Sequence, residues 1–262
     1  MDLRLEGRRA LVVGGSQGIG KATAALLSQE GAEVAIASRS TKNLAAAAED
    51  IGRGGVAPHR IVCDVTEHGA GDRLAGEIAK RWGGLDILVT VVGGSIRSAF
   101  ADLSDEDWLN NYGFNVLSTV RTIRALLPAL AEGRDPAIVT LGAASSKMPY
   151  PHQIASNVHK AGLLALTKTL AGELAERGIR VNCVAPGRTL TSLWTTRAER
   201  MAAEQSRSPE AVLEDFTKEI PLGRFGRPEE VAAMVVWLAS PCAGYITGQA
   251  INVDGGIARG LL

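Results

Sequence analysis

The sequence VVGGSQGIGKA at residues 12–22 decides the fold of this chain. A short apolar run, Arg9–Val13, leads into it, and an apolar pattern of helical period follows from Ile19 to Glu30. Glycines in such a turn permit positive φ, let a ligand approach the backbone, and let a helix begin close to a strand. The stretch therefore predicts a strand, a tight turn and a helix whose free N–H groups face an anion.

The strand-and-helix unit then repeats along the chain. We expect helices at Thr41–Gly52, at Ala70–Trp82, after Ser104, at Ile154–Arg177 and at Pro228–Ser240. The expected strands are Arg9–Val13, Glu33–Ala37, Arg60–Val65, Asp86–Val92, Ala137–Leu141, Arg180–Ala185 and Ala250–Val253. Runs such as DILVTVV are apolar without alternation, which is typical of strands covered on both faces. The expected fold is a three-layer, doubly wound α/β fold with about seven mainly parallel strands and helices on both faces.

Composition narrows the function. The 262 residues include 46% hydrophobic and 21% charged residues, which excludes a mainly disordered chain, and no linker-like stretch divides residues 1–262, so we expect a single domain. Lys+Arg and Asp+Glu both number 28, giving zero net charge, which disfavours nucleic-acid and membrane-surface partners and favours a small-molecule substrate. The three separated cysteines Cys63, Cys183 and Cys242 predict no disulfide framework, no metal site and a reducing, cytoplasmic location.

The segment 188–222 differs from the rest because it is polar, with isolated large apolar residues. We expect it to be a substrate lid without a core of its own, and the alternative is a solvated surface helix pair. Leu193, Trp194, Met201 and Phe216 in it suggest a moderately apolar substrate. Arg188 is equally compatible with binding a carboxylate and with facing solvent.

Several motifs occur in the order typical of one enzyme family. They are GGSQGIG (14–20), CDVT (63–66), DILV (86–89), Asn115, APG (185–187) followed by Thr191, PLGRFGRPEEVA (221–232) and YITGQAINVDGG (245–256). Together they resemble the short-chain dehydrogenases/reductases over nearly the whole chain. The resemblance implies a Rossmann domain that binds NAD(P) and transfers hydride between the nicotinamide and a hydroxyl or carbonyl carbon.

The cofactor residues follow from this resemblance. Asp64 and Val65 are implied at the adenine, Gly93 at the adenosine side, and Pro186, Gly187 and Thr191 at the nicotinamide end. The full expected set is Gly14, Ser16, Gln17, Gly18, Ile19, Gly20, Ser38, Arg39, Asp64, Val65, Gly93, Lys160, Pro186, Gly187, Thr189 and Thr191.

The end of the second strand indicates which dinucleotide is preferred. An acid there accepts from the ribose 2′-hydroxyl, whereas a cation binds a 2′-phosphate. Ser38 and Arg39 stand there without an acid, so NADP(H) is favoured over NAD(H). Two observations argue against this preference. Arg39 is also compatible with only stacking on the adenine, and Gln17 occupies a position where NADP-preferring relatives often carry a basic residue.

The catalytic positions depart from the family pattern. The family combines an asparagine, a serine, and a tyrosine four residues before a lysine, whose charge lowers the pKa of the phenol. Asn115 and Lys160 match, but Ser156 replaces the tyrosine, and Gly142–Ala144 stands where the serine is expected. A serine hydroxyl is less acidic and shorter in reach than a phenol, so Ser156 is no simple substitute.

Two interpretations stay open. Either the protein is an oxidoreductase in which Tyr150, His152 or His159 supplies the proton, with Ser145 or Ser146 polarising the carbonyl, or it binds the nucleotide without redox turnover. Tyr150 is equally compatible with packing beside Pro149 and Pro151, and His159 is expected at the surface or in an interface. The predicted catalytic set is Asn115, Ser156, Lys160 and Tyr150.

The helix at Ile154–Arg177 is apolar on more than one face, so its second face needs a partner. The family resemblance implies a homotetramer with two-fold axes through such helices and through the last strand. The apolar tail Ile257–Leu262 is compatible with this assembly.

Overall fold

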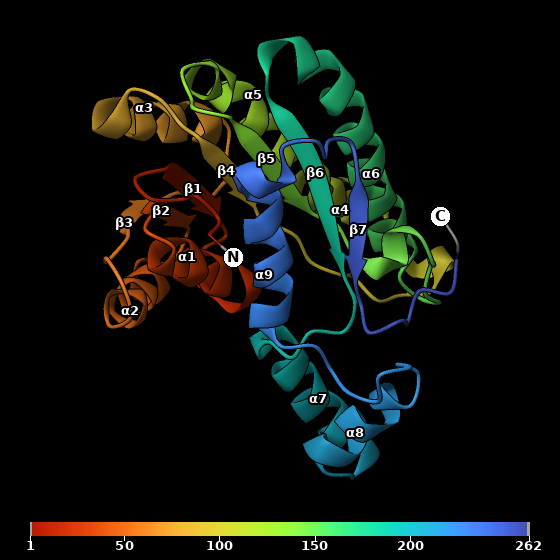
Figure 1. Ribbon diagram of the computed structural model, residues 1–262. Coiled ribbons are helices and arrows are strands. Elements are labelled where there is room, and N and C mark those ends of the chain that lie inside the picture. Colours follow the sequence, from red (N-terminus) through yellow and green to blue (C-terminus); the bar gives the residue numbers. More distant parts are fainter. Residues whose placement is uncertain (1, 261–262) are drawn as a thin grey trace.

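Seven parallel strands form a single sheet in the order β3-β2-β1-β4-β5-β6-β7 (Figure 1). The computed structural model describes residues 2–260, so Leu261 and Leu262 of the predicted apolar tail lie outside the described residues. The strands are β1 Arg9–Val13, β2 Glu33–Ser38, β3 His59–Val62, β4 Ile87–Thr90, β5 Ala137–Leu141, β6 Arg180–Pro186 and β7 Ala250–Val253. The predicted fold class is confirmed.

Two strands are shorter than predicted because pairing stops earlier than the apolar runs do. Val13 pairs with Thr90 as the last pair of β1 and β4, so Val91 and Val92 leave the sheet. Val62 pairs with Ser38 as the last pair of β3 and β2, so Cys63–Val65 follow the strand as loop.

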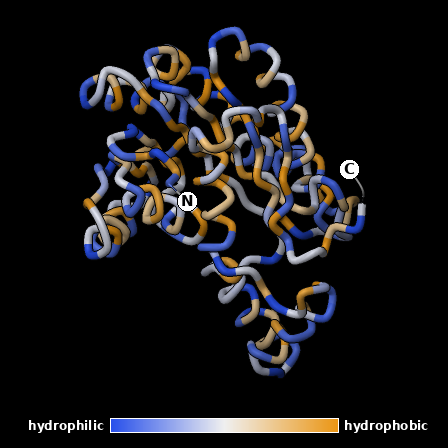
Figure 2. Tube along the Cα trace, in the orientation of Figure 1, coloured by the Kyte–Doolittle hydropathy of each residue, from blue (hydrophilic) through white to orange (hydrophobic). Residues whose placement is uncertain are grey.

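Helices cover both faces of the sheet. One core lies between the sheet and α1 Gly18–Gln29, α2 Thr41–Gly52 and α9 Pro228–Ala239. The other lies under α3 Ala70–Trp82, α5 Ser118–Ala131 and α6 Ile154–Leu174. The hydrophobic colour along the strands in Figure 2 fits strands buried from both sides.

The strand order changes direction between β1 and β4: β2 and β3 lie to one side of β1, and β4 to β7 lie to the other. Ligands bind at this point in doubly wound folds. The loops that follow β1, β4, β5 and β6 all leave the same edge of the sheet, because the strands are parallel. The candidate functional site therefore lies at this edge of the sheet, where these loops meet.

The segment 188–222 forms two further helices, α7 Ser192–Gln205 and α8 Pro209–Thr217, which extend away from the sheet in Figure 1. The expectation that this segment has no core of its own is wrong. Ala198, Ala202 and Val212 are buried together, with Met201 and Phe216 packed against them. Within residues 2–260, no helix is long and apolar enough to cross a membrane.

Candidate active site

Two adjoining cavities open at the carboxyl edge of the sheet. The small cavity, of about 160 Å³, lies where β1, β2 and β4 end, and Gly14 and Gly93 line both cavities. The lid cavity, of about 690 Å³, extends from the glycine turn to α7 and α8. Among the described residues, no cluster of acids, histidines and cysteines could hold a metal ion.

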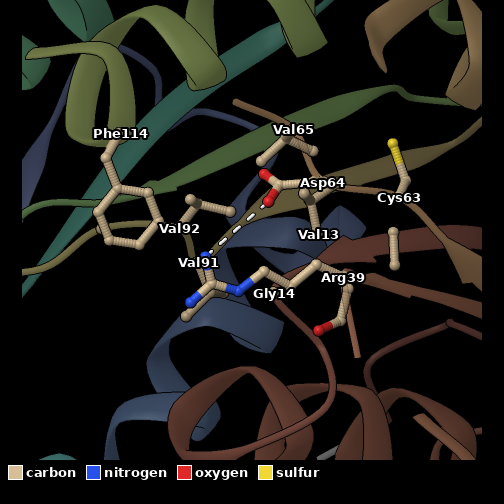
Figure 3. A pocket seen from close by; sticks show the side chains of 12 residues that line it. Val13, Gly14, Arg39, Cys63, Asp64, Val65, Val91, Val92 and Phe114 are labelled. Carbon is tan, nitrogen blue, oxygen red and sulfur yellow. Dashed lines mark ion pairs between the residues drawn. The ribbon is translucent and has the colours of Figure 1, made fainter. Parts of the chain in front are cut away.

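The predicted adenosine-side residues meet in the small cavity (Figure 3). Ser38, Arg39, Asp64 and Val65 line it, and Phe114 stands at its other side. An Arg39 guanidinium nitrogen lies 3.8 Å from an Asp64 carboxylate oxygen, although the Arg39 side chain is mainly exposed. The hydroxyl and N–H of Thr66 donate to Asp64 and, together with Arg39, hold the pKa of this carboxyl below its usual value. Asp64 therefore remains an anion beside Arg39.

The glycine turn is a cradle that side chains would fill. A Cβ on Gly20 would lie 2.1 Å from the Gly14 carbonyl oxygen, and one on Gly14, whose φ is +85°, would lie 2.7 Å from the carbonyl oxygen of Val91. Helix α1 begins at Gly18, so its first N–H groups face the lid cavity, which Ser16, Gln17, Gly18 and Ile19 line. This geometry suits a diphosphate.

The buried side chains of Lys160 and Asn115 lie against Gly93. Lys160 Nζ donates to the Leu141 carbonyl at 3.1 Å, and burial lowers the pKa of Lys160 to about 8. Asn115 Oδ1 accepts from the Gly94 N–H at 3.1 Å. A Cβ on Gly93 would lie 2.5 Å from Lys160 Nζ and 2.6 Å from Asn115 Oδ1, so glycine is required there.

A single π-helical turn orients the side chain of Asn115 toward Gly93 and Lys160. Residues Gly113–Leu117 form a π-helical turn between α4 Asp105–Tyr112 and α5. Asn115 Nδ2 donates to the Asn111 carbonyl at 3.0 Å, which fixes the amide with its oxygen toward Gly94. Such turns are rare and are frequent at functional sites.

Ser156 and Tyr150 both line the lid cavity, but their hydroxyls differ in what they contact. Ser156 is buried, and its Oγ accepts from the N–H of Ile96 at 3.1 Å, which ties α6 to the loop after β4. The Tyr150 hydroxyl is buried and has no hydrogen-bond partner among residues 2–260. Burial raises the pKa of Tyr150, and the neighbouring Arg188 partly opposes this shift.

Tyr150 also packs, as its alternative interpretation expected: it contacts a small cluster of Ala144, Ile220 and Ile257. Packing and exposure to the cavity therefore coexist in this side chain.

His159 does not lie at the surface of the chain, so the surface part of that expectation is wrong, while a place in an interface stays a prediction. It is 9% exposed, because its ring faces α4 and lies 5.5 Å from Trp108 and 5.7 Å from Tyr112 between ring centroids. Its Nδ1 lies 2.8 Å from Asn111 Oδ1, so the ring supports α4.

The remaining predicted residues divide by position. Pro186, Gly187 and Thr191 line the lid cavity, as does Ser145. Gly20 and Asn115 are buried behind the cavity walls, and Thr189 is buried beside Gly226.

Sequence reasoning missed Arg97 and Arg197, which line the lid cavity from the loop after β4 and from α7. The sequence also did not decide whether Arg188 binds a carboxylate or faces solvent. The Arg188 side chain is 9% exposed, forms an ion pair with Glu219 and lies over the Phe216 ring. One available signal was the position of Arg97 in a loop that leaves the carboxyl edge of a parallel sheet.

Known proteins share this architecture. A family model described as enoyl-(acyl carrier protein) reductase matches residues 13–258. The chain is 35% identical over 257 residues to the 3-oxoacyl-(acyl-carrier-protein) reductase FabG of Thermotoga maritima, covering 97% of this chain and 99% of that protein. L-Sorbose reductase from Gluconobacter frateurii, complexed with NADPH and L-sorbose, is similar with a TM-score of 0.95 and 32% identity, covering 100% of both chains. RhlG of Pseudomonas aeruginosa, in a complex with NADP, has a TM-score of 0.88 and 33% identity, covering 98% of both chains.

Proposed function

Because this chain belongs to the short-chain dehydrogenase/reductase family and is an NAD(P)-dependent oxidoreductase acting on carbonyl or hydroxyl groups, we propose that it uses NADP(H) and that Tyr150 serves as its proton donor. The substrate is small and moderately apolar, and segment 188–222 is its lid. Tyr150 lines the lid cavity, and its hydroxyl has no hydrogen-bond partner among the described residues; this observation carries the proposal.

The residues present fit a dinucleotide. When bound, NADP(H) supplies the hydride, and the glycine turn with the start of α1 holds the diphosphate. Asp64 and Val65 take the adenine side, while Pro186, Gly187 and Thr191 take the nicotinamide side, with Thr189 supporting that loop. Lys160 donates to the ribose hydroxyls, and Asn115 fixes the loop at Gly94.

Arg39 is the proposed determinant of NADP(H) preference. Its guanidinium faces the small cavity and is mainly exposed, so it can leave Asp64 at 3.8 Å for a 2′-phosphate. We expect Arg39→Asp to reverse the preference between NADPH and NADH in binding titrations. An unchanged NADPH affinity in this variant would remove the assignment.

Tyr150 suits the reductive direction. A phenol whose pKa is raised stays protonated at neutral pH and donates its proton when a carbonyl oxygen becomes an alkoxide. Arg188 then stabilises the phenolate that remains. Ser156 is already engaged with the Ile96 N–H, so it acts as a positioning residue for the loop after β4.

Two matched variants test this assignment. We expect Tyr150→Phe to reduce kcat for NADPH oxidation with ketones and diketones by about 100-fold or more while leaving NADPH binding intact. Ser156→Ala should retain turnover, because its hydroxyl has only a positioning role. Turnover that survives in Tyr150→Phe would refute the role of Tyr150.

Nucleotide binding without redox turnover is the second candidate, and Ser156 in place of the expected tyrosine is the observation that favours it. Tight NADPH binding with no oxidation against any carbonyl of the panel would support that candidate instead. A homotetramer and a cytoplasmic location also stay predictions; the described cysteines Cys63, Cys183 and Cys242 are all free.

A further inference from the structure

The lid cavity carries an excess of positive charge. Among its described lining residues, four are cationic, Arg97, Lys160, Arg188 and Arg197, and one is anionic, Glu219, so the formal sum is 4 − 1 = +3. The chain as a whole has zero net charge, so this excess is local. Like charges gathered in a partly enclosed cavity repel one another unless an anion joins them.

Two of these cations already have partners. Arg188 donates to the Phe216 carbonyl and forms an ion pair with Glu219. Lys160 donates to the Leu141 carbonyl and belongs to the proposed cofactor group. Arg188 and Glu219 cancel in the formal sum, so the excess comes from Lys160, Arg97 and Arg197.

Arg97 and Arg197 are the unpaired cations. Within residues 2–260, neither has a carboxylate within ion-pair distance, and the buried Nε of Arg197 has no hydrogen-bond partner. The Arg197 guanidinium lies over the ring of Trp194 at 4.5 Å and over that of Phe216 at 5.3 Å, both measured to the ring centroid. Stacking on two rings holds this side chain at the cavity wall without neutralising it.

Burial and the neighbouring positive charges both change the pKa of Arg197. Burial lowers the pKa of Arg197 to about 10, and the neighbouring Arg97, Arg188 and Arg200 contribute in the same direction. The group remains charged at neutral pH, and its charge has no counterion. An anionic ligand beside the guanidinium would relieve the repulsion.

The anionic parts of the cofactor do not account for these arginines. The glycine turn and the start of α1 provide for the diphosphate, and Arg39 provides for a 2′-phosphate in the small cavity, which neither Arg97 nor Arg197 lines. The free donors are therefore available to the other ligand of the cavity, the substrate.

We propose that Arg97 and Arg197 bind a carboxylate of the substrate, so that the enzyme reduces oxo acids and oxidises hydroxy acids. This inference rests on the proposed function of the same site. A guanidinium fork matches the two oxygens of a carboxylate, and the ring of Trp194 beside it accepts the apolar part of the molecule.

The experiment compares 2-oxopentanoate, 4-oxopentanoate and benzoylformate, each with its methyl ester, in NADPH oxidation. The acids should have a kcat/KM at least about tenfold above their esters, and Arg197→Gln should abolish that preference while changing ester turnover little. Arg200→Gln is the matched control, because Arg200 lies on the same helix but does not line the cavity. It should keep the preference.

Binding gives a second readout that does not depend on turnover. Calorimetry of the same acids and esters is performed on the apoprotein and on protein saturated with NADP⁺. Acids that bind while esters do not, with the difference lost in Arg197→Gln, support the carboxylate site even if no carbonyl is reduced. Equal binding of acids and esters, or an Arg197→Gln variant that loses only NADPH affinity, would overturn it, as would a preference for dihydroxyacetone phosphate over every acid.

Discussion

Lys160 lowers the stability of the apoprotein, and its proposed role is to bind the cofactor. Its ammonium is enclosed and has one hydrogen-bond acceptor among the described residues, the Leu141 carbonyl. Burial lowers the pKa of Lys160 to about 8 from the ordinary value of 10.5, which means that the folded apoprotein disfavours the charged form. Since the unfolded chain then holds the proton more tightly, the stability of the apoprotein rises with pH between about 8 and 10.5.

Cofactor binding should have the opposite pH dependence. The proposed role of Lys160 needs the charged form, so the affinity for NADPH should fall as pH rises through about 8. We expect Lys160→Met to weaken NADPH binding at pH 7 by about tenfold, to remove the pH dependence, and to raise the melting temperature of the apoprotein. Fluorescence titrations and thermal melts from pH 7 to pH 10 measure both effects. A wild-type affinity that is flat across this range would contradict the role.

At the scale of elements, the turn between β1 and α1 depends on the absence of side chains. A Cβ on Gly20 would meet the Gly14 carbonyl oxygen at 2.1 Å, so the helix would have to move away from the strand. We expect Gly20→Ala to lower NADPH affinity by about 100-fold and to destabilise the protein by about 2–3 kcal/mol, as overpacking does. Chemical unfolding and calorimetry measure the two effects.

Gly76→Ala is the control for that change. Gly76 is exposed inside α3, and a Cβ there would have no neighbour within 4 Å. This variant should be more stable than wild type by about 0.5–1 kcal/mol, because alanine is the better helix former, and it should bind NADPH normally. If Gly20→Ala behaved like Gly76→Ala, the close approach of α1 to the turn would not matter for binding.

The elements themselves were predictable because strands buried on both faces carry continuous apolar runs and their helices begin and end at recognisable residues. Strand ends were less predictable, because the last pair, Val13 with Thr90, depends on where the partner strand turns away. The wide turn that aims Asn115 and the convergence of Arg97 with Arg197 depend on contacts between distant segments. No local pattern encodes such contacts, so these features required the structure.

At the scale of the whole molecule, α4 and α6 leave apolar side chains without cover. Leu109 on α4 is 69% exposed and Val158 on α6 is 52% exposed, while His159 joins the two helices through Asn111. A helix that buries one face on the sheet and exposes apolar groups on another is suited to an isologous contact with a second copy. This is the physical basis for the homotetramer that we propose.

A charge placed in this patch should separate the copies. The wild-type chain should scatter light as a species of about 110 kDa, four times its 27.4 kDa, and Val158→Glu should shift it to a smaller species, since an unpaired carboxylate cannot be buried in the contact. Val56→Glu is the matched control, because Val56 is 74% exposed and lies in the loop between α2 and β3. It should leave the mass unchanged. A wild-type monomer at micromolar concentration, or dissociation by both variants alike, would refute an interface built on α4 and α6.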